Sequence, residues 1–549
     1  MTLRLYLDAD SLAEAGNSEV FDDFNWLIHQ QTYDNLAASF IEYLESMLVG
    51  STLSPESKID LALSIYPITN ECFSFAASYI NVLAGEQLDA DLVYSDRSLF
   101  YPIIVSHRAN KSNSTSASLS QLSASIAKTQ SFRSHGRNFA KGIRTRSRKL
   151  SLLKNSRLRN PRKYSMTSNA LSRSWVSSDD LILRSLMSAP RRGYETFAKT
   201  PPESSIDHQI AEQFCEIVES LGYESDGLFY EFVRRISSIH FNNAKVGREK
   251  NYEKYINTNG SLLLTATGGG FESRLMSHVF QRNNLPVVRF SHGGERGLID
   301  DVRWHYAEVT FTDSYILHGK TEAEQSREAI SRKTTSLTSP NLRLFGAGSE
   351  SHNLIRRKQA KPDRTGTVKN VMVTANSLGA ERRSGFASTG EEAPYLEWHR
   401  RLLIKLSKTD YNVISKRHPK DLFATRRLFS GIVDKELISG SFTNMLDQAD
   451  AFVFDFAASA FMEALCTNKP VVLIEFPHRT LSKAGRDDVA KVCTIVPAEF
   501  DDQNRIVTDI DHVINGLREP VDHTARDHFV NRYLLEPSDD IGDFIDMLR

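Results

Sequence analysis

The sequence predicts an α/β protein with two doubly wound domains, each built on a parallel sheet. Two series of short apolar runs alternate with amphipathic helical patterns, over residues 261–349 and 368–476. A polar, basic stretch at 356–367 separates them. The chain has 549 residues, more than the roughly 250–300 that one hydrophobic core serves. Strands alternating with helices favour parallel pairing through right-handed crossovers, so we expect two such sheets facing one another.

The elements before the first series are mostly helical. Residues 3–7 and 91–95 have the short apolar pattern of strands, and the stretch between them, to about residue 85, is typical of helices. Amphipathic patterns predict two further helices, which begin near Ser205 and Phe229.

Each series can be divided in chain order. In the first, we expect a helix over 271–284 and strands over 261–267, 285–291, 309–319 and 341–349. In the second, we expect helices over 395–408 and 458–468 and strands over 368–376, 411–419, 451–456 and 469–476. The implied organisation is a Rossmann-like N-terminal domain at 1–350, a linker at 351–367, a C-terminal domain at 368–520 and a helical tail at 521–549.

Composition restricts the class of protein. The net charge of -1 predicts no overall attraction to nucleic acid or membrane. The four cysteines lie far apart without a C-x-x-C pair, which argues against a zinc site or disulfide framework and fits a reducing compartment. The start lacks the apolar run of a signal peptide, and no apolar stretch of about 18 residues occurs. A soluble cytoplasmic protein is therefore expected.

One segment departs from the average composition. Residues 97–178 contain seventeen Lys or Arg and no Asp or Glu, within a Ser-rich, basic insertion expected over 97–200. The first interpretation is a solvated, partly disordered insertion. A second is docking of residues 106–165 on an anionic membrane surface. Nucleic-acid binding is a third, but aromatic residues for base stacking are few.

The most informative cluster follows a predicted strand at 291–297, with the sequence SHGGERG. Ligands of open α/β sheets bind beyond the carboxyl ends of strands. There His292 and Glu295 suit acid/base work, and Arg296 suits a carboxylate or phosphate. Gly293 and Gly294 allow the backbone to approach a ligand closely. The alternative is a simple turn whose histidine caps the strand.

A second cluster lies at the end of the second strand expected in the second series. It contains Lys416, Arg417, His418 and Pro419. Pro419 ends that strand, so we expect two cations and a histidine at the rim, suited to a diphosphate or phosphodiester. The alternative is a basic surface turn.

A third cluster joins the end of a strand to the start of a helix. Asp455 ends the strand, and Ser459 near the helix start can present its hydroxyl and backbone N–H groups to an anion. Glu463 lies one helical turn further on, where a carboxylate can receive ribose hydroxyls. Ser459 can equally be a plain helix cap.

Two weaker candidates complete the set. Gly268 and Gly269 precede a helix, as in an anion-binding nest, but without the G-x-G-x-x-G or P-loop spacing. Asp313 is expected to end a strand and line the same cleft, with a buried structural role as the alternative. No metal-ligand spacing occurs, so no metal or cofactor is expected.

These residues resemble a known group of proteins. SHGGERG, then HYAEVTFTDSYILHG, then DFAASAFMEALCTNKPVVL resemble bacterial surface-carbohydrate transferases of the GT-B fold. The matching positions are His292, Gly293, Gly294, Gly297, Glu308, Asp313, Gly319, Asp455, Ser459, Glu463, Asn468 and Pro470. The element from Lys416 to Pro419 is similar to the H-P motif of CMP-sugar transferases, including those for Kdo and sialic acid.

The resemblance implies a metal-independent glycosyltransferase. The C-terminal domain would hold a CMP-linked ulosonic acid, through the Lys416–Pro419 element on phosphate, Ser459 on phosphate and Glu463 on ribose. The N-terminal domain would contact a glycan or lipid-linked acceptor, with His292, Glu295 and Asp313 as acid/base candidates. The product would be a capsule or lipopolysaccharide glycan, made in the cytoplasm or at the inner membrane.

Three alternatives stay open at this point. A polyol-phosphate transferase that uses CDP-glycerol would have the same fold and a similar phosphate clamp. A two-domain nucleotide-sugar epimerase would share the fold but need no acceptor. A nucleic-acid-binding protein would use the basic segment and show steeply salt-dependent binding.

Overall fold

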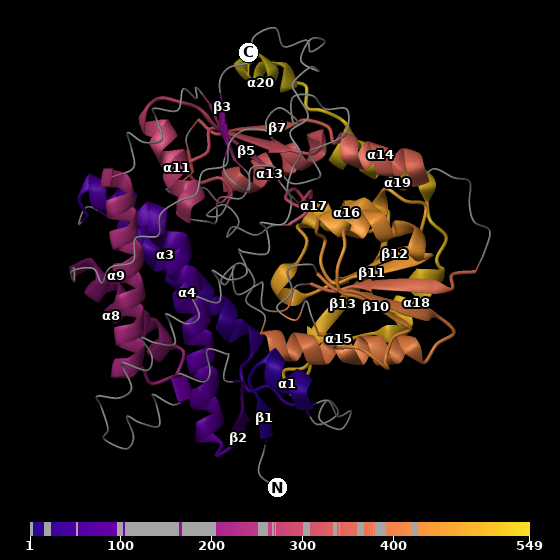
Figure 1. Cartoon of the computed structure of the whole chain (residues 1–549), viewed down its shortest axis with the longest axis horizontal. Coiled ribbons are helices and arrows are strands. Elements are labelled where there is room, and N and C mark those ends of the chain that lie inside the picture. The colour runs from indigo at the N-terminus through magenta and orange to yellow at the C-terminus, as the bar shows by residue number, and fades with distance from the viewer. Residues whose placement is uncertain are drawn as a thin grey trace.

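The architecture consists of two large parallel sheets, one small sheet and a layer of long helices (Figure 1). The computed structural model describes residues 4–15, 24–50, 53–95, 103–104, 164–166, 205–250, 262–265, 268, 271–291, 293–299, 308–332, 338–339, 341–359, 367–376, 378, 391–418, 423 and 426–548. The basic insertion therefore lies almost wholly outside the described residues.

The C-terminal sheet has seven strands in the order β10-β9-β8-β11-β12-β13-β14. Their bounds are β8 Asn370–Thr374, β9 Asn412–Lys416, β10 Lys435–Leu437, β11 Ala451–Phe454, β12 Val471–Glu475, β13 Thr494–Phe500 and β14 Ile506–Thr508. All pairings are parallel except that of β13 with β14. Numbered along the domain, the order is 3-2-1-4-5-6-7, so the first six strands follow the Rossmann order.

Alternating side chains explain why this sheet is covered on both faces. Val371 and Val373 of β8 pack in one apolar cluster, while Met372 between them packs in another. Strand β11 alternates in the same way, with Val453 in the first cluster and Phe452 in the second. The covering helices are α15 (Glu392–Ser407), α16 (Ser459–Leu465), α17 (Lys483–Val489), α18 (Ile510–Arg518) and the 3₁₀ helices η6 (Phe442–Gln448) and η7 (Pro477–Arg479).

The second large sheet has five parallel strands in chain order, β3-β4-β5-β6-β7. The strands are β3 Tyr164–Met166, β4 Leu262–Thr265, β5 Val287–Phe290, β6 Ser314–Leu317 and β7 Arg343–Gly346, and the helices that follow strands are α11 (Phe271–Arg282), α13 (Lys320–Arg332) and α14 (Glu350–Gln359). Leu262 and Leu264 pack on one face, and Leu263 packs on the other with α11.

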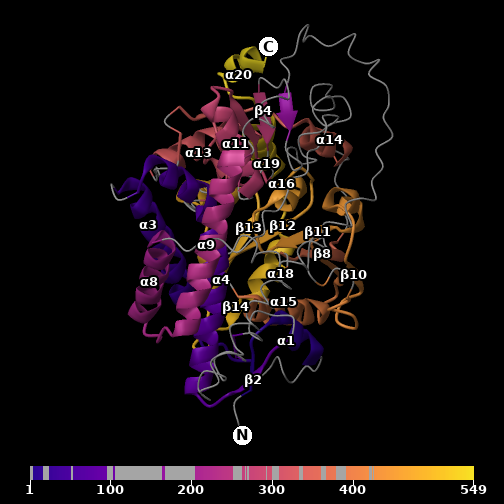
Figure 2. The same cartoon turned by 60° about the vertical axis from the view of Figure 1, so that its left-hand side comes forward.

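Long helices run along one side of the molecule (Figures 1 and 2). They are α3 (Gln30–Val49), α4 (Pro55–Gln87), α8 (Ser205–Ser220) and α9 (Gly227–Lys250). Their shared core contains stacked rings, such as Phe40 on Phe214 and Phe75 on Phe232, with centroids 3.8 and 3.7 Å apart. At one end of this layer, α4 contacts α11 of the five-stranded sheet.

The N-terminal stretch lies at the other end of the helical layer, beside the C-terminal domain. Strands β1 (Arg4–Tyr6) and β2 (Asp91–Val93) form a separate two-stranded parallel sheet. Helix α1 (Ala9–Ala15) contacts α15, and Phe24 and Trp26 are buried in the core of the C-terminal domain. The start of the chain is thus part of the packing of its last domain.

The end of the chain returns to the five-stranded sheet through α19 (His523–Val530), the π-helix η8 (Asn531–Leu535) and α20 (Ile541–Leu548). The Ser349 N–H donates to the Leu534 carbonyl at 2.7 Å, and the Ser538 N–H donates to the Gly346 carbonyl at 2.9 Å. The Phe544 ring lies 5.7 Å from that of Phe345. This returning segment ties the two domains together.

The predicted α/β fold with two parallel-sheet domains is confirmed. The expected strands before residue 96 are present as β1 and β2, with long helices between them. The stretch expected to be a linker begins as helix α14, which extends to Gln359. None of the helices in the described ranges has both the length and the apolar character needed to cross a bilayer.

Replacing Arg526 by Met should destabilise the C-terminal domain. Arg526 is 4% exposed, and its guanidinium donates to the carbonyls of Thr467, Lys469 and Val492, which the variant leaves without this donor. Loss of buried hydrogen bonds of this kind predicts a fall of about 2–5 kcal/mol in the free energy of unfolding. Chemical denaturation measures it. Arg532→Met, at an exposed position on η8, should change stability little; equal effects would contradict the assignment.

Candidate functional site

The strand order creates one special position in the C-terminal sheet, between β8 and β11. Chain connections leave these neighbours in opposite directions, and ligands of such sheets bind beyond the carboxyl ends there. Asp455 directly follows β11 and is 7% exposed. Its carboxylate accepts hydrogen bonds from the Asn376 N–H at 3.1 Å and from the Tyr395 hydroxyl. These contacts hold the loops after β8 and β11 beside the start of α15.

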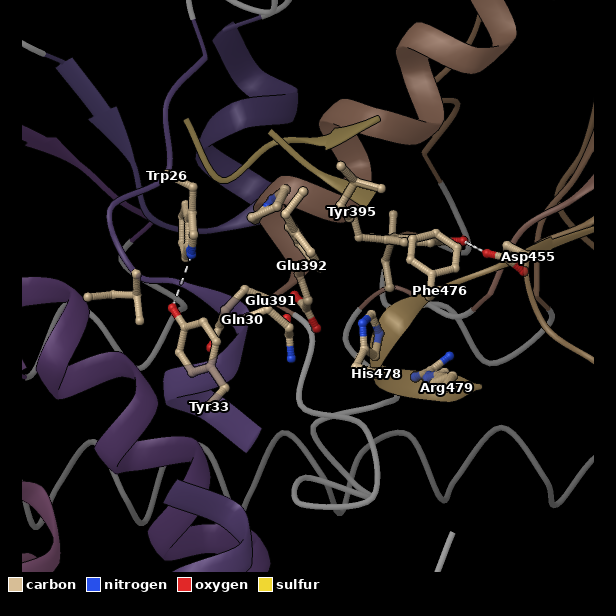
Figure 3. A pocket seen from close by; sticks show the side chains of 15 residues that line it. Trp26, Gln30, Tyr33, Glu391, Glu392, Tyr395, Asp455, Phe476, His478 and Arg479 are labelled. Carbon is tan, nitrogen blue, oxygen red and sulfur yellow. Dashed lines mark hydrogen bonds between the residues drawn. The ribbon is translucent and has the colours of Figure 1, made fainter. Parts of the chain in front are cut away.

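A pocket opens at this point, here called the switch-point pocket (Figure 3). Its lining comes from several stretches of the chain: residues 26–33, Leu378 after β8, residues 391–395 at the start of α15, Asp455 after β11, residues 476–479 after β12, and Phe500 and Ile506 of β13 and β14. Figure 3 shows Trp26 and Tyr33 on one side, and Phe476 with the adjacent η7 residues on the other. The pocket therefore joins the N-terminal stretch to the carboxyl edge of the C-terminal sheet.

The polar lining of the switch-point pocket carries more negative than positive groups. Glu391, Glu392 and Asp455 contribute carboxylates, whereas His478 and Arg479 contribute the basic groups. The Arg479 guanidinium lies over the Phe456 ring, 5.0 Å from its centroid. Carboxylates beside aromatic and aliphatic walls suit an uncharged ligand with several N–H or O–H donors, while Arg479 suits an anionic group at the edge.

Ser459 and Glu463 both lie on α16, as expected. Ser459 is the first residue of the helix, and no side-chain hydrogen bond caps it. The Glu463 carboxylate accepts from the Thr443 hydroxyl at 2.7 Å, and burial raises its pKa above the ordinary value. Asp455 and Ser459 are four residues apart at the same edge of the sheet.

The predicted loop after β5 packs directly against this helix. Gly294 has a φ of +85°, and a Cβ there would lie 3.3 Å from Met462 of α16. Further along, Ile299 forms a β-bridge with Leu481, and the Ser482 N–H donates to the Leu298 carbonyl at 2.8 Å. Residues 293–299 of the five-stranded domain thus pack on the surface of α16 and α17.

Glu295 is a buried carboxylate within this loop, 5% exposed. Its oxygens lie over Gly293, so close that a Cβ at that position would overlap them. The Arg296 guanidinium is 3.5 Å from both Glu295 and Glu308. The Arg296 backbone N–H donates to Glu322 of α13, whose carboxylate also accepts the His318 N–H at 2.7 Å. Glu322 therefore fixes the loop to the end of β6.

The second predicted cluster differs from the expectation of two cations at the rim. Lys416 and Arg417 are only 2% and 1% exposed. The Arg417 guanidinium lies 3.3 Å from Glu436 on β10, which neutralises it inside the domain. Burial, and then Arg417, lower the pKa of Lys416, whose ammonium donates to the Arg417 carbonyl at 2.5 Å. His418 is half-buried at the carboxyl end of β9.

Asp313 also lies away from the expected place. It precedes β6 rather than ending a strand, and its carboxylate accepts from the Gln281 amide and the Val287 N–H, at 2.7 and 2.8 Å. It therefore joins the amino ends of β5 and β6, on the edge opposite to the site. Gly268 is buried after β4. His292, Gly269 and Pro419 lie outside the described residues.

Sequence reasoning missed several residues that line the switch-point pocket. Tyr395 starts an amphipathic helix and carried no motif, although its hydroxyl contacts Asp455. Trp26 and Tyr33 are more than 340 residues away in sequence from Glu391. The sequence signal that could have pointed to this wall is E-E-A-P-Y at 391–395. This pattern is typical of a polar helix start, and it follows the strand expected at 368–376. Among the described residues no cluster of His, Cys, Asp or Glu is arranged to hold a metal ion.

No protein-family model and no curated protein matches the chain. Some solved structures are similar to part of the chain. UDP-GlcNAc 2-epimerase from Neisseria meningitidis, bound to UDP-GlcNAc, is 11% identical, covering 56% of this chain and 80% of its own, with a TM-score of 0.33. The glycosyltransferase SnogD from Streptomyces nogalater is 10% identical, covering 66% and 87%, also at 0.33. A UDP-glucosyltransferase from Polygonum tinctorium is 10% identical, covering 68% and 92%, at 0.33. These similarities are low, and the two-sheet architecture is defined by the strand order of this chain.

Two glycines of the loop after β5 should respond differently to replacement by Ala. At Gly297, a Cβ would lie 2.9 and 3.0 Å from backbone atoms of Glu322, so Gly297→Ala should cost about 1–3 kcal/mol of stability. At Gly293, the Cβ would meet only the flexible end of Glu295, which can move, so Gly293→Ala should cost less. Thermal unfolding of both variants measures the difference. A larger loss at Gly293 would show that the Glu295 carboxylate is rigidly held.

His399 should make the protein less stable in acid. Burial, and then the nearby Arg417, lower its pKa from 6.5 to about 3. The unfolded chain therefore binds a proton below pH 6.5 that the folded chain does not, and stability falls as pH drops toward 3. His399→Leu should lower this pH dependence by up to about 1.4 kcal/mol per pH unit, measured by denaturation at pH 7, 6, 5 and 4. An unchanged slope would contradict a neutral buried imidazole.

Proposed function

We propose that this chain is a glycosyltransferase of the GT-B type that transfers a sugar from a nucleotide donor to a growing surface glycan. The favoured donor is a CMP-linked ulosonic acid such as Kdo or a sialic-like acid. The observation that carries the proposal is the meeting of two strand-end sites: the loop 293–299 of one domain packs on α16 of the other, and α16 begins four residues after Asp455 of the switch-point pocket.

The donor side of the proposal uses the C-terminal domain. The switch-point pocket offers carboxylates and apolar walls for a nucleoside, and Asp455 lies where Rossmann sheets bind ligands. Arg479 and His418 are the partly exposed basic groups proposed to contact phosphate, in place of the buried Lys416 and Arg417. Ser459 would donate to the phosphate, and Glu463 would accept from ribose.

The acceptor side uses the loop of the five-stranded domain. In the proposed reaction the acceptor hydroxyl attacks the anomeric carbon, the bond from that carbon to the phosphate oxygen breaks, and CMP leaves. A base must take the hydroxyl proton. Glu295 is the described candidate, because its buried carboxylate lies in the loop that faces the C-terminal domain, with Arg296 beside it. His292 is the second candidate from the sequence.

The acceptor is proposed to be a glycan or a lipid-linked sugar at the inner membrane. The support is the composition of residues 97–178, with seventeen basic and no acidic residues. Basic segments of this kind bind anionic lipid surfaces at on the order of 1 kcal/mol per residue. The enzyme would then act in the cytoplasm, peripheral to the membrane.

A nucleotide panel tests the proposal. CMP should raise the melting temperature of the protein in a thermal-shift assay, because it binds only the folded state, whereas CDP, UDP, UMP and GDP should raise it less. Arg479→Gln and His418→Ala should each weaken CMP binding by about tenfold, the effect of losing a hydrogen bond to a charged group. The shift at a given CMP concentration would fall accordingly.

The matched control is Arg332→Gln, which removes an exposed guanidinium at the end of α13 and should keep the full shift. Stabilisation by CDP or UDP in preference to CMP would contradict the donor and favour CDP-glycerol or a UDP-sugar. If no nucleotide changes the melting temperature, the transferase proposal is wrong.

A further inference from the structure

One carboxylate of the switch-point pocket belongs to an N-cap residue that does not cap its helix. Glu391 is the N-cap residue of α15, with extended backbone angles of φ -81° and ψ 147°. Its side chain does not cap the helix, although N-cap side chains commonly accept a backbone N–H of the first turn. The residue is only 8% exposed and lines the pocket. Its carboxylate therefore lines the pocket without capping the helix.

The wall next to Glu391 comes from the beginning of the chain. Gln30, the first residue of α3, is 6% exposed and lines the pocket. Figure 3 shows Gln30 and Glu391 side by side near the centre of the pocket, with Tyr33 below them. The Tyr33 hydroxyl is engaged by Trp26 and Asn81, at 3.0 and 2.8 Å, which fixes this wall.

We propose that Glu391 and Gln30 read the base of the nucleotide and select an amino-bearing pyrimidine, cytosine, over uracil. This inference rests on the function proposed above, and it names the residues that set the nucleotide preference. A carboxylate accepts hydrogen bonds and cannot donate them, so it pairs with the 4-amino group of cytosine. It faces the 4-carbonyl oxygen of uracil with no proton between them. The Gln30 amide donates one N–H to Asp34 at 3.3 Å, and its second N–H can donate to the ring nitrogen or carbonyl of cytosine.

Charge in the pocket gives an independent reason to place the base, not the phosphate, here. Glu391 and Glu392 supply two carboxylates near the centre, whereas Arg479 and Asp455 lie toward the right of the view (Figure 3). A phosphate among the carboxylates would be repelled, whereas a neutral base between apolar walls is not. Phe476 and Pro394 are buried parts of those walls. The nucleotide is thus oriented with its base toward the N-terminal stretch and its phosphate toward η7.

The test compares CMP with UMP on the full-length protein by isothermal titration. The wild type should bind CMP about tenfold or more tightly than UMP, the ratio expected for one hydrogen bond to a charged group. Glu391→Gln should bring the ratio near one, because the amide can either accept from cytosine or donate to uracil. Gln30→Leu should weaken both nucleotides, and CMP more. Glu391→Gln should keep a melting temperature close to that of the wild type, because the amide has the same size as the carboxylate and also accepts hydrogen bonds.

Glu350→Gln is the matched control, because it makes the same change at the first residue of α14, outside the pocket, and should keep the wild-type ratio. A ratio unchanged in Glu391→Gln, while Arg479→Gln still weakens CMP, overturns this inference and leaves the proposed function standing. Preference of the wild type for UMP overturns the base assignment. Absence of binding by either nucleotide overturns both proposals.

Discussion

The pairing of β8 with β11 is the contact on which the candidate site depends. The two strands are more than 70 residues apart in sequence, yet four residue pairs align them, from Ala451 opposite Val371 to Phe454 opposite Thr374. This pairing is strong because side chains on both faces of both strands are buried. It forces the chain to leave the neighbouring strand ends in opposite directions. The space between those ends is where Asn376, Tyr395 and Asp455 meet.

A site at one sheet edge is incomplete until other parts of the chain reach it. The five-stranded domain supplies the loop 293–299, and the returning segment through η8 holds that domain in place by backbone hydrogen bonds with Gly346 of β7, Ser349 and Lys320 of α13. Glycines make these contacts possible, since a Cβ on Gly319 would overlap the backbone of Tyr533. Backbone-to-backbone packing of this kind leaves little freedom for sliding, so the loop and α16 keep a defined relation.

Local patterns predicted the parts of the fold that local physics determines. The apolar runs identified β4 to β9, β11 and β12, because buried parallel strands are continuously apolar. Short or antiparallel additions such as β10 and β14 carried no such signal. Arg417 was expected at the rim. Its burial is explained by Glu436 of the neighbouring strand β10, whose carboxylate pairs with the guanidinium. The pocket wall at Trp26 could not be predicted from the sequence, because contacts between residues far apart in the chain produce no periodic pattern.

The burial of the chain's first residues in its last domain has a consequence for synthesis. Phe24 and Trp26 leave the ribosome before most of the chain exists, and their apolar partners, such as Phe476, are made far later. During that interval these aromatic side chains have no native core to enter, so the nascent chain exposes them to chaperones or to other nascent chains. The helical layer can assemble early, but Ala9, Leu12, Phe24 and Trp26 reach their native partners only when the last sheet is complete.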